Sequence, residues 1–149
     1  VLLTTYSFGH LTSTTGTEFK DLAVMLAAFN AGATGTNKLT SIEKASKIYD
    51  GNGTGGAYPN TAGLLKAGTS KENGEMKLVF TDANIYKVVL KAESWSATTG
   101  DKVTLNGIEE KLEFGPGSSV TFNFLEATNT LDFVFAKRAI IFSIEVYTA

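Results

Sequence analysis

The stretch that decides the fold is Ile85-Tyr86-Lys87-Val88-Val89-Leu90-Lys91-Ala92-Glu93-Ser94-Trp95. Side chains of a β-strand alternate between two faces, so this stretch predicts a strand with one apolar and one polar face. The apolar face comprises Tyr86, Val88, Leu90 and Ala92, and the polar face comprises Lys87, Lys91, Glu93 and Trp95. We therefore expect a central strand that packs on a core with one side and carries the only tryptophan on the other.

The same alternation continues along the chain after this strand. Asn106-Gly107 separates two alternating runs, and this dipeptide is the strongest short hairpin signal because both residues tolerate the positive φ of a type I′ turn. The inward positions of the later runs are aromatic: Phe114, Phe122, Phe124, Phe133, Phe135 and Phe142. Many short strands separated by turns predict a mainly β protein, folded as an antiparallel β-sandwich.

One segment near the N-terminus departs from the β pattern. Leu22, Met25, Leu26 and Phe29 recur at helical spacing, so we expect one short helix over about residues 20–31. Thr17 or Glu18 would open this helix, and Gly32 would close it. The helix either plugs one end of the core or binds a partner with its apolar stripe. The segment 40–46 is compatible with both a strand and a helical turn.

The composition indicates one globular domain over residues 1–149 that needs neither a disulfide nor a metal to bury a core. The absence of cysteine excludes disulfides, thiol nucleophiles and thiolate metal sites. A net charge of −2 without a basic cluster disfavours nucleic acid as a partner. No apolar run reaches the roughly 18 residues of a membrane span, so we expect no membrane insertion by this segment. Because the sequence starts at Val1, we expect it to be a fragment of a larger protein.

Several spaced motifs occur together over about residues 46–147: Lys47–Gly56, Ala62–Ser70, Gly74, Tyr86–Trp95 and Val103–Gly107. In combination they resemble a jelly-roll β-sandwich module of surface and secreted proteins in low-GC Gram-positive bacteria and mollicutes. Some of these modules are appended to extracellular endonucleases. The resemblance implies a non-catalytic accessory module, exported to the cell surface or the extracellular space, in a jelly-roll-like fold. The resemblance implies neither the identity of a ligand nor any catalytic residues.

Trp95 is the strongest candidate for a ligand-binding residue. An aromatic ring on the polar face of a strand can stack on a sugar ring, and Lys91 and Glu93 flank it with hydrogen-bonding groups. Further candidate ligand-binding residues are Tyr58, Tyr147 and Asn123. The alternative is structural: Trp95 closes the edge of the sandwich by packing against the helix or the glycine-rich segment.

The glycine-rich segment that follows Asp50 permits two further interpretations. Gly51–Gly56 matches a dinucleotide-binding pattern, but residues 57–60 do not start the helix that a pyrophosphate site requires. Asp50, Asn52 and Thr54 resemble the start of a calcium loop, but the twelfth position is Thr61 and not glutamate, which excludes an EF-hand. A looser structural calcium site at these three residues remains an alternative to a plain glycine loop. We expect no other cofactor.

Catalytic chemistry has little support in the sequence. His10 is the only histidine, which disfavours zinc and leaves a Ser-His-Asp triad without a nucleophile elbow. Paired carboxylates could hydrolyse glycosides, but the glutamates on predicted strands are expected to point into solvent. These residues are Glu93, Glu109, Glu113 and Glu145. We expect no enzyme, although a cryptic hydrolase is the third hypothesis.

The leading hypothesis from the sequence is an accessory module that binds a carbohydrate or another surface ligand, with a glycan or a surface protein as its partner. The alternative is a structural or adhesion spacer that takes no small ligand.

Overall fold

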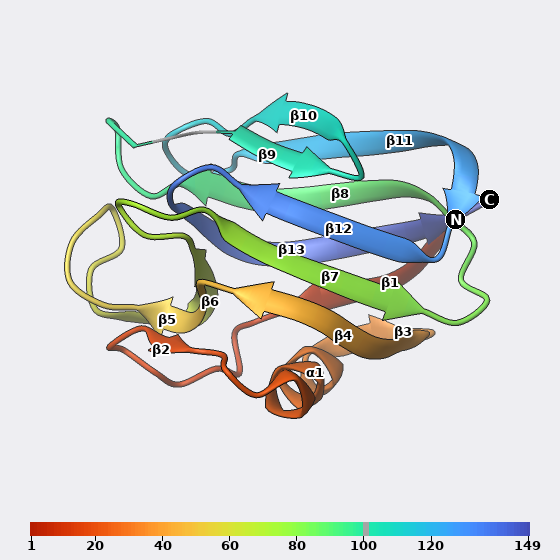
Figure 1. Ribbon diagram of the computed structural model, residues 1–149, viewed down its shortest axis with the longest axis horizontal. Helices are drawn as coiled ribbons and strands as arrows, with labels where there is room; N and C mark the ends of the chain where they lie inside the picture. Colours follow the sequence, from red (N-terminus) through yellow and green to blue (C-terminus); the bar gives the residue numbers. More distant parts are fainter. Residues whose placement is uncertain (100–101) are drawn as a thin grey trace.

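The computed structural model describes residues 1–99 and 102–149, and it consists of two antiparallel β-sheets packed face to face (Figure 1). The larger sheet contains β1 (Leu2–Ser7), β2 (Thr17–Glu18), β3 (Ala33–Gly35), β5 (Ile48–Asn52), β6 (Thr61–Ala67), β8 (Ile85–Ser94), β11 (Ser119–Thr128) and β13 (Ala139–Thr148). The smaller sheet contains β4 (Leu39–Ser46), β7 (Gly74–Phe80), β9 (Lys102–Leu105), β10 (Ile108–Lys111) and β12 (Thr130–Phe135). The predicted mainly β sandwich is confirmed.

The larger sheet is built around β8 and β13, in the strand order β11-β8-β13-β6-β5-β2. β13 pairs with β8 along one edge, and its other edge is shared end to end by β6 and β1. The smaller sheet has the order β10-β9-β12-β7-β4. The predicted hairpin joins β9 to β10, where Asn106 and Gly107 have φ values of 49° and 82°.

The two sheets bury a single core between them. Phe122 from the larger sheet and Phe133 and Phe135 from the smaller sheet are fully buried in one hydrophobic cluster. Val88 and Leu90 of β8 face the same cluster, as their alternation predicts. Because each sheet offers one apolar face, stacking the two removes both faces from water at once.

Three aromatic residues that the alternation places inside lie elsewhere. Phe142 faces outward because the pairing of β13 with β8 shifts register between Ile141 and Ser143, and a bulge reverses the alternation beyond it. Tyr86 is 39% exposed, and Ile85 takes the buried position instead, next to a second register shift. Phe114 is 53% exposed because it follows the end of β10 at Lys111.

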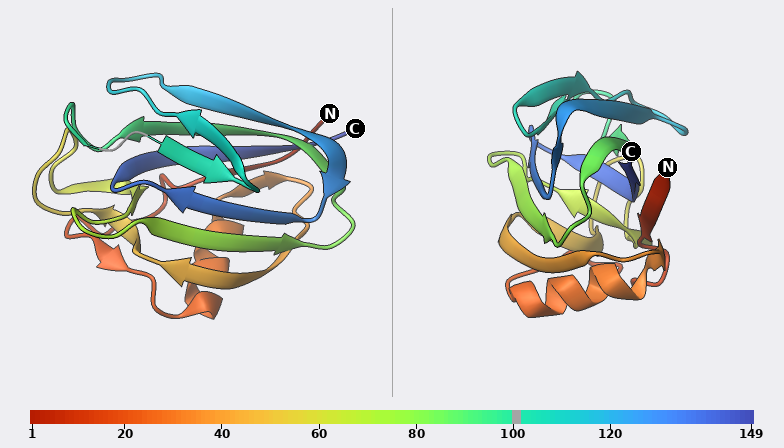
Figure 2. Two further views of the ribbon diagram at one scale, coloured as in Figure 1. Left: turned by 45° about the horizontal axis from the view of Figure 1, so that its top comes forward. Right: turned by 90° about the vertical axis from the view of Figure 1, so that its right-hand side faces the viewer.

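The helix α1 (Leu22–Ala31) covers one side of the sandwich beside β4 (Figure 2). Its buried residues Met25 and Phe29 face the core, and the Phe29 ring contacts the ring of Phe8 at 5.1 Å. Asp21 caps the helix by accepting hydrogen bonds from the backbone N–H groups of Ala23 and Val24. The expected opening at Thr17 or Glu18 is therefore wrong, since these two residues form β2. Within the described ranges, no helix is long and apolar enough to cross a bilayer.

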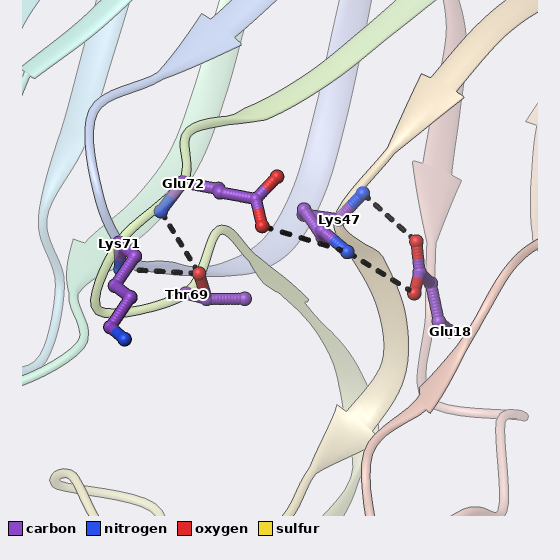
Figure 3. Close-up of polar contacts among 5 residues, drawn as sticks. All are labelled: Glu18, Lys47, Thr69, Lys71 and Glu72. Carbon is purple, nitrogen blue, oxygen red and sulfur yellow. Dashed lines mark hydrogen bonds and ion pairs between the residues drawn. The ribbon is translucent and has the colours of Figure 1, made fainter.

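Lys47 forms the corner at which the chain passes from the smaller sheet to the larger one, between β4 and β5. Its φ is 56°, and its backbone N–H donates to Oε2 of Glu18 at 3.2 Å. Its Nζ lies 3.9 Å from a carboxylate oxygen of Glu18 and 3.9 Å from one of Glu72 (Figure 3). The hydroxyl of Thr69 accepts from the backbone of Lys71 and Glu72, which orders the adjoining loop. Lys47 thus ties the edge strand β2 to the corner.

Candidate functional site

Three of the candidate ligand-binding residues meet on the outer face of the larger sheet. Tyr58, Lys91 and Glu93 line a cavity of about 430 Å³. Phe142 and the segment Gly117-Ser118-Ser119 complete the lining. The cavity therefore joins β8 and β13 to the segment before β6 and to the start of β11.

Glu93 forms the buried polar wall of this cavity. The sequence pattern places Glu93 in solvent, but only 4% of the residue is exposed, so that expectation is wrong. The buried carboxylate has a partner in Tyr58, whose hydroxyl donates a hydrogen bond of 2.7 Å to Oε1 of Glu93. The segment that carries Tyr58 is held in turn by Asn52, whose Nδ2 donates to the carbonyl oxygens of Gly55 and Tyr58 at 3.0 and 2.6 Å.

The pairing with Glu93 changes the acidity of Tyr58. The hydrogen bond to Glu93, then burial, then the charge of Glu93 raise the pKa of Tyr58 to about 12. Tyr58 therefore remains a neutral phenol at neutral pH, and its hydroxyl proton is committed to Glu93. Its ring is then free to serve as an apolar surface.

The rings of Tyr58 and Phe142 form the aromatic wall. Their centroids lie 5.4 Å apart, with planes at 74° in an edge-to-face arrangement. Phe142 was not identified as a site residue from the sequence because strict alternation places it inside. The sequence does contain a signal for this in the run Ala139-Ile140-Ile141-Phe142. Four consecutive apolar residues cannot all face one core in an alternating strand, so some of them must lie on the outer face.

A row of polar contacts continues from the cavity along the same face. Nζ of Lys91 lies 3.8 Å from Oε2 of Glu145, and the Tyr147 hydroxyl donates to Oε1 of Glu145 at 3.3 Å. Nζ of Lys87 lies 4.1 Å from the centroid of the Tyr147 ring. Burial, and then the charge and hydrogen bond of Glu145, raise the pKa of Tyr147. Tyr147 is thus linked to the cavity through Lys91 without lining it.

Trp95 lies apart from the cavity lining and packs against the glycine-rich segment. Its Nε1–H donates to Oδ1 of Asn52 at 3.1 Å, and Arg138 places Cζ 3.7 Å from the ring centroid. A Cβ at Gly55 or Gly56 would lie within 3 Å of the indole. Trp95 therefore packs against the glycine-rich segment, as the structural alternative to ligand binding predicts. The indole ring is occupied by contacts within the protein.

The calcium site at Asp50, Asn52 and Thr54 remains a prediction. Oδ1 of Asp50 accepts from the backbone N–H of Ser13 at 3.3 Å, and both polar atoms of the Asn52 side chain are bonded within the protein. Thr54 is exposed. In the part of the chain that the structure describes, no three His, Cys, Asp or Glu side chains group to hold a metal.

The remaining candidates for catalysis are scattered over the surface. Nε2 of His10 lies 2.8 Å from the carbonyl oxygen of Ala28, which ties the loop after β1 to the helix. Glu109 lies 3.8 Å from Nζ of Lys102, and Glu113 is exposed. Glu145 is engaged with Lys91 and Tyr147.

A scan against protein-family models gives no match to this chain, and a search of the curated proteins also gives none.

Proposed function

We propose that this chain is a non-catalytic carbohydrate-binding module that takes one sugar unit of a glycan in the cavity beside Tyr58 and Phe142. One observation carries the proposal: an edge-to-face pair of aromatic rings and several hydrogen-bonding side chains line the same space of about 430 Å³. A sugar ring has the matching chemistry, because its C–H groups form apolar patches and its hydroxyls form a polar rim.

Each wall has a distinct task in this proposal. The aromatic pair of Phe142 and Tyr58 contacts the C–H groups of the sugar, and the two rings are held edge to face before the ligand arrives. Ser118, Ser119 and Lys91 offer donors, and the unused oxygen of Glu93 offers an acceptor. Because Tyr58 and Glu93 already bind each other, little side-chain entropy is lost on binding.

The proposed setting is the cell surface or the extracellular space. This part of the proposal rests on the resemblance to jelly-roll modules of surface and secreted proteins, with which the two-sheet architecture agrees. The competing hypothesis is a structural or adhesion spacer that takes no small ligand, and binding measurements separate it from the proposed module.

The test is binding to an array of immobilised neutral and acidic glycans, followed by calorimetric titration of each glycan retained. We expect Phe142→Ala to weaken binding about tenfold or more, because the buried apolar contact is lost. Lys91→Met and Ser119→Ala alter exposed residues of the lining, so they should weaken binding while the melting temperature stays unchanged.

Phe114→Ala is the matched control, since it removes an exposed phenylalanine that does not line the cavity. Equal binding by wild type, Lys91→Met and Ser119→Ala would contradict the proposed cavity. Retention of no glycan by the wild-type protein would leave the spacer as the better hypothesis.

A further inference from the structure

The turn between β12 and β13 carries two adjacent cations in an unusual backbone conformation. Lys137 and Arg138 have φ values of 42° and 89°, a region that L-residues rarely adopt. Such strain persists only where the surrounding structure imposes it, and it often marks a functional site. Arg138 is also the only arginine of the chain.

The guanidinium of Arg138 is fixed in place but incompletely bonded. Its Cζ lies 3.7 Å from the centroid of the Trp95 ring, a cation–π contact that holds the group against the indole. Its Nε is the one buried side-chain N or O atom without a hydrogen-bond partner among the described residues. An unpaired buried donor is costly, so it is a reason to look for a missing acceptor.

A polar hollow of about 220 Å³ adjoins this turn. Among the described residues, its lining consists of Lys137, Arg138 and the hydroxyl residues Ser70, Thr98 and Thr99. The hydroxyls of Thr98 and Thr99 are both hydrogen-bonded to Ser96. Within the described part of the chain, the Ser70 hydroxyl makes no such bond.

Among the residues that the structure describes, no carboxylate neutralises the positive charge at this turn. Neither Lys137 nor Arg138 forms a salt bridge with a residue in the ranges 1–99 and 102–149. Burial, and after it the charge of Arg138, lowers the pKa of Lys66. Glu72 follows Ser70 closely, but its carboxylate faces Lys47 (Figure 3).

We propose that this hollow binds a tetrahedral oxyanion, a sulfate or phosphate group, through Arg138, Lys137 and Ser70. Arg138 supplies a planar set of donors that matches two oxygens of such a group. Lys137 supplies a mobile charge, and Ser70 supplies a hydroxyl donor. The proposal does not depend on the sugar-binding cavity, because none of these residues lines it.

Two signals of the protein report on this hollow without ambiguity. Trp95 is the only tryptophan, so its fluorescence reports on the stacked guanidinium. Arg138 gives the only arginine Nε–H cross-peak in a ¹⁵N spectrum. The experiment titrates inorganic phosphate and then sulfate, with sodium chloride at equal ionic strength as the reference. We expect a saturable shift of both signals with phosphate and sulfate only.

Variants assign the shift to the hollow. Lys137→Gln should weaken phosphate binding about tenfold, because it removes a charge-assisted hydrogen bond. Ser70→Ala should weaken it less, and Arg138→Lys should weaken it although the charge is retained. Lys20→Gln is the control, because Lys20 is exposed and lies among acidic residues at another surface depression. Equal affinity of Lys137→Gln and wild type, or an equal response to chloride, would overturn the proposal.

The source of the oxyanion is resolved by comparing inorganic sulfate, dextran sulfate and uncharged dextran. Binding of dextran sulfate that is much tighter than that of inorganic sulfate, and lost in Lys137→Gln, identifies a sulfated or phosphorylated polymer. Equal affinities per sulfate group identify the free anion. If uncharged dextran bound as tightly as dextran sulfate, and if both bound Lys137→Gln as well as wild type, the polymer would be recognised through its sugars, and a sulfated polymer would be excluded as the ligand of the hollow.

Discussion

Gly56 lies directly against the indole of Trp95. Its φ is 74°, and a Cβ built there would lie 2.6 Å from Cε2 of the indole and 2.8 Å from the Trp95 carbonyl oxygen. A glycine is therefore required twice, for its backbone conformation and for the space. The backbone N–H of Ala57 donates to the same carbonyl oxygen at 2.9 Å, so the glycine segment is fixed to the residue that directly follows β8.

We expect Gly56→Ala to lower the free energy of unfolding by about 3 kcal/mol, from left-handed strain and overpacking combined. Gly107→Ala is the matched control, since Gly107 has a φ of 82° and nothing within 4 Å of its Cβ position. The control should lose only the strain, about 1–2 kcal/mol. Urea unfolding measures both, and equal losses would show that the contact with Trp95 is unimportant.

At the scale of single elements, α1 shows how local and tertiary signals combine. Met25 and Phe29 of the helical stripe are buried, whereas Leu22 is 37% exposed at the first turn. Gly32 ends the helix as expected, and its Cβ position would lie 1.9 Å from the carbonyl oxygen of Ser7. The helix is thus packed against the end of β1 as well as against β4.

Asp21→Ala should destabilise the protein by about 1 kcal/mol, because two backbone N–H groups at the start of α1 lose their acceptor. Asp21→Asn retains a side-chain oxygen and should cost only a fraction of that amount. Thermal melting followed by circular dichroism compares the two variants. A loss in Asp21→Asn as large as in Asp21→Ala would mean that the charge, and not the cap, stabilises the helix.

At the scale of the whole molecule, the corner at Lys47 connects the two sheets. Besides its contacts with Glu18 and Glu72, Lys47 accepts a hydrogen bond of 2.7 Å at its carbonyl oxygen from the N–H of Gly68. The corner therefore joins β2, the β4–β5 connection and the loop after β6 (Figure 3). The Glu18 side chain is 20% exposed, and the Glu72 side chain is 62% exposed.

Glu18→Ala should lower the free energy of unfolding by about 1–2 kcal/mol, since the backbone N–H of Lys47 loses a partly buried acceptor. Glu72→Ala removes only an exposed ion pair and should cost less than about 0.5 kcal/mol. Chemical denaturation of both variants distinguishes them. If Glu72→Ala were the more harmful change, the corner would depend on the loop after β6 instead of on β2.

The sequence by itself predicted the mainly β class, the short helix and the Asn106-Gly107 hairpin, because the strand alternation, the helical spacing and the turn signal each involve residues close together in the chain. Alternation also identified Val88 and Leu90 as core residues and placed Lys91 on the outer face. It failed at Tyr86 and Phe142, because a bulge is set by the pairing of neighbouring strands and not by the strand alone.

Only the tertiary structure decided the surroundings of the candidate sites. The segment that follows β5 brings Tyr58 to Glu93 and the glycines to Trp95, which buries a carboxylate and covers an indole that the pattern leaves exposed. Likewise, the turn before β13 places Arg138 on Trp95. These contacts join residues far apart in the chain, and no local period of the sequence encodes them, because they depend on how the loops cross the folded sheet.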